Sequence, residues 1–177
     1  MKKLILLITL FSLGLIADDS KFYSFEMNNV EGKNVKLDKY KGKVLMVVNV
    51  ASRCGLTKQY TALQKIYSEY KAKGFEVVAF PCNDFRGQEP GTDKEILEFC
   101  QTKYNVSFDI MSKIHVLGEK QHPLYKYLTS AKGSGPIKWN FEKFIIDKSG
   151  KVVGRFSPKT KPDDKKITEM ISAELAK

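Results

Sequence analysis

Three cysteines are the residues of this 177-residue chain best suited to covalent chemistry. Cys54 follows the apolar run Val44–Val50 and precedes a segment with helical spacing, so it lies at a strand-to-helix junction, where sites form in open α/β sheets. Unpaired amide N–H groups, the helix dipole and the neighbouring Arg53 would stabilise a thiolate there, and a thiolate is a nucleophile. Position alone leaves a second interpretation open, that of a buried and unreactive cysteine.

Three strings around and after Cys54 favour the reactive interpretation. They are NVASRCGLT at residues 49–57, FPCNDFRGQEPG at 80–91 and KWNFEKF at 138–144. In this order they resemble the signature strings of the glutathione peroxidase family, and the resemblance extends from Lys21 to the C-terminus. It implies a thiol peroxidase that reduces hydrogen peroxide or organic hydroperoxides, an antioxidant enzyme of the response to oxidative stress.

The resemblance also implies a catalytic group of four residues. Cys54 takes the place of the peroxidatic residue, which some relatives fill with selenocysteine, and Gln88, Trp139 and Asn140 take the places of its hydrogen-bonding partners. The residue types fit these roles, because two amides and an indole N–H can donate to sulfur and to the departing oxygen without titrating. Taken singly, Trp139 is more readily interpreted as a core aromatic residue and Gln88 as a solvated loop residue, and only the shared pattern with Cys54 favours the catalytic interpretation.

Two residues depart from the family pattern in the loop expected to bring Gln88 to Cys54. Asp84 stands where the family usually has Gln, and Arg86 stands where it usually has Gly. An acidic side chain near the site would raise the pKa of the thiol, and Arg86 would oppose that change. The sequence leaves open which of the two effects is larger.

The other two cysteines have different predicted roles. Cys100 stands where two-cysteine members of the family carry a resolving cysteine, which condenses with the sulfenic acid to form a redox-active disulfide. The resemblance implies that a thioredoxin-type protein, or alternatively glutathione, then acts as the reductant. Because a disulfide needs Cα atoms within about 7 Å, we expect the predicted helix around Cys100 to unfold locally on oxidation. Cys82 is interpreted as structural, and a buried cysteine without redox function is the alternative for Cys100.

Other chemistries are disfavoured by the spacing of the remaining residues. The chain contains no C-x-x-C pair, and neither His115 nor His122 has a zinc-like spacing to a cysteine, so we expect no metal and no cofactor. Neither histidine falls in a signature string, which argues against a Cys–His hydrolase. The remaining alternative to a peroxidase is an exported redox sensor or relay that passes oxidation to a partner thiol protein.

The elements that must position these residues follow from hydrophobic patterns, turn residues and caps. They comprise a hairpin of Phe22–Met27 and Val35–Leu37; strands at Val44–Val50, Phe75–Phe80, Phe141–Asp147 and Lys151–Phe156; a helix from near Leu56 to Tyr70 closed by Gly74; a helix with the capping box Thr92-x-x-Glu95 that runs through Cys100; and a last helix from Pro162 to the end. This order predicts an α/β domain of the thioredoxin-like fold, a central mixed sheet flanked by helices with an N-terminal β-hairpin.

Composition and charge limit the classes of function. With 42% apolar and 28% charged residues, the chain is of ordinary globular composition, and its length predicts one domain. The net charge of +10 comes from lysines that are spread along the sequence rather than clustered. A solvated surface accounts for that pattern, and no nucleic-acid partner is expected.

The first residues have the pattern of a targeting segment. A positive start at Met1–Lys3, an apolar stretch over Leu4–Ile16 and the small Ala17 predict a secretory signal peptide over residues 1–17, followed by a glutathione-peroxidase-type domain over 18–177. The mature protein is then expected in the periplasm or outside the cell, with no stable membrane insertion. Leu15 stands where a small residue is usual, so an uncleaved anchor is the alternative. The short stretch from Ser130 to Lys138 favours a monomer.

Overall fold

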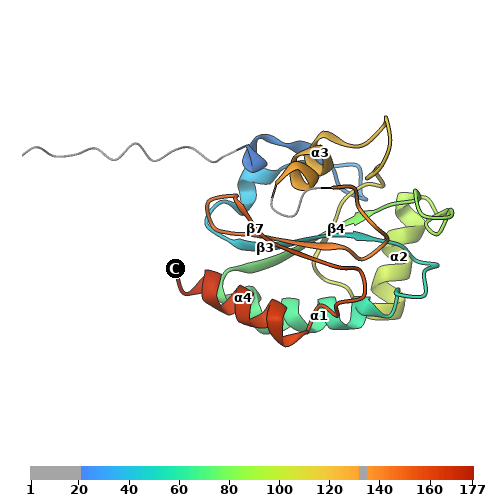
Figure 1. Ribbon diagram of the computed structural model, residues 1–177. Helices are drawn as coiled ribbons and strands as arrows, with labels where there is room; N and C mark the ends of the chain where they lie inside the picture. Colours follow the sequence, from blue (N-terminus) through green and yellow to red (C-terminus); the bar gives the residue numbers. More distant parts are fainter. Residues whose placement is uncertain (1–20, 132–134) are drawn as a thin grey trace, which may run out of the picture.

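The computed structural model describes residues 21–131 and 135–177, and the predicted signal peptide lies outside these ranges. At its centre is a mixed sheet of five strands in the order β5-β4-β3-β6-β7 (Figure 1). β3 is parallel to β4 and antiparallel to β6, so the mixed character predicted from the sequence is confirmed. The strands are β3 (Val44–Val50), β4 (Phe75–Pro81), β5 (Asp109–Ile110), β6 (Lys143–Ile146) and β7 (Val152–Phe156).

The central strand β3 divides the interior into two cores. All seven of its residues are buried, as expected of an apolar run in the middle of a sheet covered on both faces. Its even-numbered residues from Val44 to Val50 pack against α1 (Gln59–Tyr70), α2 (Asp93–Tyr104) and α4 (Lys165–Leu175). Leu45 and Val47 pack on the opposite side. We call the first side the three-helix face.

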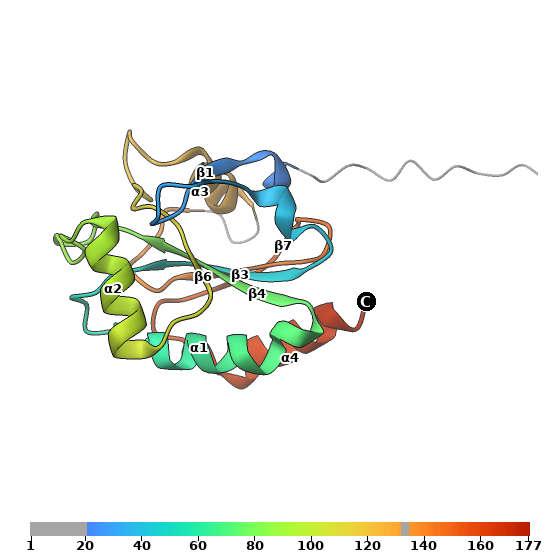
Figure 2. The same ribbon diagram turned by 180° about the vertical axis from the view of Figure 1, so that it is seen from behind.

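The opposite side, here called the α3 face, is covered by α3 (Pro123–Ser130) and by N-terminal segments. Those segments are the hairpin of β1 (Glu26–Asn28) and β2 (Asn34–Lys36) and the short 3₁₀ helices η1 (Phe22–Ser24) and η2 (Leu37–Tyr40). Figures 1 and 2 show α1 and α4 on one side of the sheet and α3 on the other. The N-terminal hairpin predicted from the sequence is present.

Several helix boundaries follow from the expected caps. The side chain of Thr92 accepts from the amide of Glu95 and receives the reciprocal bond, which is the capping box predicted at the start of α2. α1 continues as the 3₁₀ turn η3 (Lys71–Lys73), and Gly74 closes it with a φ of 94°, a left-handed conformation that favours glycine. α1 begins at Gln59 rather than near Leu56, because residues 55–58 form turns instead of helix.

Further features differ from the sequence-based expectation. The last helix, α4, begins at Lys165 rather than Pro162, and Phe22–Ser24 form the 3₁₀ helix η1 rather than strand. The strand expected from Phe141 begins only at Lys143, because Phe141 adopts a φ of 67°, which interrupts extended structure. Neither β5 nor α3 was predicted. β5 has two residues, too few to show alternation, and α3 is capped by the side chain of His122, which is not one of the usual capping residues. Within the described residues, no helix combines the length and apolar character needed to cross a bilayer.

Candidate active site

Cys54 lies just beyond the carboxyl end of β3, at the junction predicted from the sequence. Its side chain is 9% exposed. The amide of Leu56 donates to its Sγ at 3.4 Å. The amide of Cys54 donates to Thr57 Oγ1 at 3.0 Å, and that hydroxyl in turn donates to the carbonyl of Ala51 at 2.8 Å. Thr57 thus fixes the turn, and a backbone N–H is aimed at sulfur, the arrangement that stabilises a thiolate over a thiol.

Gln88 and Asn140 are brought together although 52 residues separate them. Asn140 Nδ2 donates to Gln88 Oε1 at 3.0 Å, and the amide of Arg53, next to Cys54, donates to the Gln88 carbonyl at 3.0 Å. The Gln88 loop is therefore tied directly to the Cys54 turn. Asn140 is fully buried, and its Oδ1 has no hydrogen-bond partner within the described parts of the chain. Two neutral amides thus form a polar pair beside the Cys54 turn.

Trp139 is the fourth residue of the predicted group, and it packs near the Cys54 turn. Its half-buried ring packs against the core that contains Cys54, and its centroid lies 5.2 Å from that of Phe85. The guanidinium of Arg86 lies over the indole at 5.6 Å from the ring centroid. The indole is thus held between the loop that carries Gln88 and the core, and the structure gathers the segments of all four predicted residues around one turn.

Asn49, to which the sequence analysis gave no function, holds the segment of Trp139 and Asn140 in place. Its Nδ2 donates to the carbonyl of Trp139 at 3.0 Å, and its Oδ1 accepts from the amide of Glu142 at 3.1 Å. The segment that carries Trp139 and Asn140 is therefore pinned to β3, five residues before Cys54. The sequence did contain one signal for this role. Asn49 is a polar side chain within a run of valines that is predicted to be buried, and a buried polar group must find hydrogen-bond partners.

Asp84 and Arg86, the two departures from the family pattern, contact different parts of the molecule. The Asp84 carboxylate bonds to His115 Nδ1 at 2.6 Å and accepts from the amides of Val116 and Leu117. Burial favours a higher pKa for Asp84, but these hydrogen bonds outweigh it and the pKa is lowered. Arg86, at a left-handed φ of 55°, stacks on Trp139. Asp84 therefore anchors the loop to residues 115–117, while Arg86 packs against the indole.

Cys54, Cys82 and Cys100 are free thiols, and they divide between the two faces of the sheet. Cys54 and Cys100 belong to the core of the three-helix face, whereas Cys82 belongs to the core of the α3 face. Burial raises the pKa of Cys100 to about 11, an effect opposed by the Tyr60 hydroxyl and increased by the charge of Glu89. Burial also raises the pKa of Cys82 to about 12. Neither thiol is ionised at neutral pH in this state of the protein.

Glu89 is a second residue to which the sequence analysis gave no function. It is fully buried, accepts a short hydrogen bond from the hydroxyl of Ser52, and its amide donates to Asn83 Oδ1 at 2.8 Å. Burial raises its pKa, and hydrogen bonds from Ser52 oppose that shift. Lys113 Nζ donates to the carbonyls of Glu89 and Gly91. These contacts tie the segment before α2 to the Cys54 turn.

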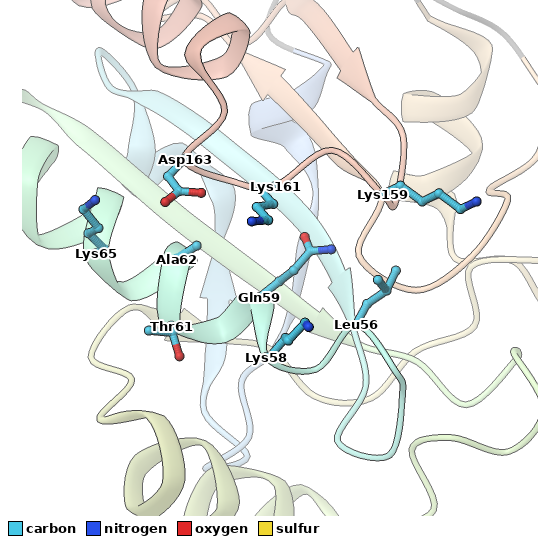
Figure 3. Close-up of a pocket in the computed structure, with 9 residues that line it drawn as sticks. All are labelled: Leu56, Lys58, Gln59, Thr61, Ala62, Lys65, Lys159, Lys161 and Asp163. Carbon is cyan, nitrogen blue, oxygen red and sulfur yellow. The ribbon is translucent and has the colours of Figure 1, made fainter.

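Two shallow hollows adjoin the Cys54 turn. One, of about 400 Å³, is lined by Leu56, the first two turns of α1 and the loop before α4. Figure 3 shows its four lysines, with Gln59 and Ala62 among them. The other, of about 410 Å³, is lined by Leu56, Trp139, Pro158 and flanking polar residues. In the described residues no group of three or more His, Cys, Asp or Glu side chains is placed to hold a metal ion.

Comparison with known proteins identifies the family. The family model described as glutathione peroxidase matches residues 22–129. The chain belongs to the glutathione peroxidase family. It is 49% identical over 159 residues to glutathione peroxidase-like peroxiredoxin 2 of Saccharomyces cerevisiae, covering 86% of this chain and 98% of the yeast protein. It is 50% identical over 146 residues to a glutathione peroxidase of Lactococcus lactis, covering 81% and 93% of the two chains.

Solved structures of the glutathione peroxidase family agree with this assignment. The crystal structure of T. cruzi GPX1 superposes with a TM-score of 0.71 at 39% identity, covering 88% of this chain and 96% of that one. A thioredoxin-family protein of Chlorobium tepidum, at 21% identity and a TM-score of 0.59, covers 86% and 93% and shows the shared fold. The predicted thioredoxin-like fold is confirmed, and the chain is a peroxidase of this family that acts in defence against peroxides.

Proposed function

We propose that Cys54 is the peroxidatic residue and that the Leu56 amide at its sulfur is the observation that carries this assignment. The thiolate of Cys54 attacks one oxygen of the peroxide, an S–O bond forms and the O–O bond breaks. The other oxygen leaves as water or an alcohol after it takes up a proton, and Cys54 becomes a sulfenic acid. The thiolate is oxidised and the peroxide is reduced, so this step requires no metal.

Gln88, Trp139 and Asn140 supply neutral donors for this step in the proposed mechanism. Asn140 holds Gln88 through the 3.0 Å amide bond, which orients the free N–H₂ of Gln88 as a donor. The indole N–H of Trp139 is a third donor. Donors fixed before the reaction stabilise charge on the departing oxygen without a reorganisation cost during the reaction. Their neutrality also matters, because a nearby carboxylate would disfavour the thiolate.

Cys100 is the proposed resolving residue. It shares a core with Cys54, whereas Cys82 lies on the other face of the sheet. Its thiol attacks the sulfenic sulfur of Cys54, the S–O bond breaks, and the thiol proton and the hydroxyl leave as water. Because Cys100 is fully buried in α2, α2 must unfold locally before the disulfide forms. A thioredoxin-type dithiol, or alternatively glutathione, restores the reduced enzyme.

Peroxide consumption by the purified mature protein tests this function. Hydrogen peroxide and an organic hydroperoxide are supplied separately with a thioredoxin system or with glutathione. We expect turnover with both peroxides, faster with the thioredoxin system. A protein that instead forms a lasting mixed disulfide with one partner and consumes no peroxide catalytically would be a redox relay, which the peroxidase relatives do not favour.

We also propose that the protein is exported as a monomer. The support is the order of charged, apolar and small residues in Met1–Ala17 and the short chain between Ser130 and Lys138. N-terminal sequencing of the protein from the exported fraction should begin near Asp18. An intact Met1 on protein in the cytoplasmic fraction would contradict export, and sedimentation of the mature protein checks its oligomeric state.

A further inference from the structure

Lys143, the first residue of β6, is a buried lysine that the catalytic scheme above does not use. Its side chain is fully buried, and its Nζ donates to Gln59 Oε1 at 2.5 Å, to the carbonyl of Thr160 at 2.5 Å and to that of Pro158 at 3.2 Å. All three acceptors are neutral oxygens. Within the described residues no carboxylate bonds to the Nζ, and burying an ammonium group without such a partner is costly, so its presence calls for a function beyond packing.

The three bonds hold one turn of the chain. Residues 157–160, between β7 and α4, form a turn in which the Thr160 amide donates to the Ser157 carbonyl at 3.1 Å. Gln59 reinforces the grip, because its Nε2 donates to the Pro158 carbonyl at 2.8 Å. Lys143 and Gln59 therefore bind the inner side of this turn to β6 and α1.

The outer side of the same turn forms a wall of the second hollow, which Leu56 of the Cys54 turn also lines. Ser157, Pro158 and Lys159 line the hollow that also contains Leu56 and Trp139. Leu56 lines both hollows, and its amide is the group that donates to Cys54 Sγ. Figure 3 shows Gln59 between Leu56 and the loop that carries Lys159. An organic group attached to a peroxide at Cys54 would enter here, whereas hydrogen peroxide has no such group.

We propose that Lys143 is a positioning residue for organic hydroperoxides, because it holds the 157–160 turn as the wall against which their apolar group packs. The inference rests on the proposed function of Cys54. It deepens that function by assigning the hollow of Leu56, Trp139 and Pro158 to an alkyl or aryl group. The substrate class is an apolar hydroperoxide, and the residue that determines its affinity does not touch it.

The protonation of Lys143 predicts a pH dependence of activity that a residue acting only by packing would not produce. Burial lowers the pKa of Lys143 to about 7, and the charge of Glu142, itself paired with Arg155 at 2.6 Å, opposes that shift. The charged residues that line the proposed hollow are Lys138 and Lys159. The neighbouring hollow adds Lys58 before α1, Lys65 of α1, and Lys161 and Asp163 of the loop before α4. A neutral amine has two N–H groups for three oxygens. The hydrogen bonds from Lys143 that hold the turn therefore weaken as pH rises through about 7.

The experiment compares cumene hydroperoxide with hydrogen peroxide in wild-type protein, Lys143→Met and Lys166→Met. kcat/KM is measured for both peroxides with the same reductant across neutral pH, and their ratio cancels the ionisation of Cys54. We expect Lys143→Met to raise KM for cumene hydroperoxide about tenfold and to leave hydrogen peroxide within about twofold. The wild-type ratio should fall as pH rises through about 7, and the Lys143→Met ratio should stay flat. Lys166→Met, which removes an exposed charge from α4 outside both hollows, should resemble wild type.

Gln59→Leu supplies an independent variant and should lower the cumene ratio in the same direction. Equal losses with both peroxides in Lys143→Met, an unchanged ratio, or the same change in Lys166→Met would each overturn the inference. Wild-type protein that reduces hydrogen peroxide but not cumene hydroperoxide would overturn the inference alone. Wild-type protein that reduces neither would overturn the proposed function as well.

Discussion

Cys54 and Cys82 occupy nearly the same local geometry on opposite faces of one sheet. Each follows the carboxyl end of a parallel strand, and each sulfur accepts from the amide two residues later, at 3.4 Å from Leu56 and at 3.5 Å from Asp84. Yet Cys54 is 9% exposed beside neutral donors, whereas Cys82 is completely buried beside the Asp84 carboxylate. An amide at sulfur is therefore not sufficient for a reactive thiol; access and the charge of the surroundings decide.

The two faces also differ in the residues that share a core with each cysteine. On the three-helix face, Cys100 in α2 shares the core with Cys54, and Ser52, Glu89 and Lys113 connect that turn to the segment before α2. On the α3 face, Cys82 is surrounded by apolar residues and no second cysteine belongs to its core. In the proposed scheme, the partner thiol for Cys54 is therefore Cys100, which lies on the same face.

The largest expected effect comes from Cys54→Ser. The hydroxyl of serine is far less acidic and less nucleophilic than a thiol, so peroxide reduction should be abolished with every reductant. Stopped-flow or coupled assays of peroxide consumption measure this. Residual turnover above background would mean that another cysteine, Cys82 or Cys100, reacts with peroxide.

Cys100→Ser should separate the first chemical step from turnover. The first reaction with peroxide should proceed at close to the wild-type rate, because the attacking sulfur and its donors are unchanged. The sulfenic acid on Cys54 should persist, label with a dimedone-type probe or over-oxidise. Turnover with a thioredoxin-type reductant should fall to near the level of Cys54→Ser, while turnover with glutathione can survive. Unchanged thioredoxin-driven turnover would remove Cys100 from the scheme.

Trp139→Phe should slow the oxidation of Cys54 and leave the fold nearly intact. The substitution keeps an aromatic ring against Phe85 and removes the only indole N–H of the chain. Loss of one preorganised donor in comparable sites costs about 10²–10³ in rate. The rate of thiol oxidation under single-turnover conditions measures the effect, and an unchanged rate would show that Trp139 acts only by packing.

The smallest effect is expected from Cys82→Ser, the matched substitution on the α3 face. Peroxide turnover with either reductant should stay within about twofold of wild type, because this thiol has no part in the scheme. Its buried hydroxyl should lower the free energy of unfolding by about 1–3 kcal/mol. Denaturant unfolding measures that loss. Blocked thioredoxin-driven turnover would instead assign the resolving step to Cys82.

The sequence predicted those parts of the molecule whose physical signal is local. β3 was predicted to the residue because a continuous apolar run bounded by turns has few alternatives, and the capping box marked the start of α2. Phe141 interrupted the next strand through a left-handed backbone that tertiary packing imposes. The two-residue β5 and the eight-residue α3 were too short for periodicity to detect.

The candidate site shows the same division. The three strings indicated Cys54, Gln88, Trp139 and Asn140, and the structure gathers their segments. Asn49, Glu89 and Lys143 were not assigned, because their importance depends on partners distant in sequence. Each is a polar residue that the fold buries completely. The conflict between a polar side chain and a buried position can be recognised only once the burial is known.

The most direct test of the central claim is the location of the disulfide formed on oxidation. The mature protein is treated with one equivalent of hydrogen peroxide, blocked with a thiol-alkylating reagent, digested without reductant and mapped by mass spectrometry. The account predicts a Cys54–Cys100 disulfide with alkylated Cys82. A Cys54–Cys82 disulfide, or a Cys54 that remains an alkylated thiol while peroxide is consumed, would contradict it.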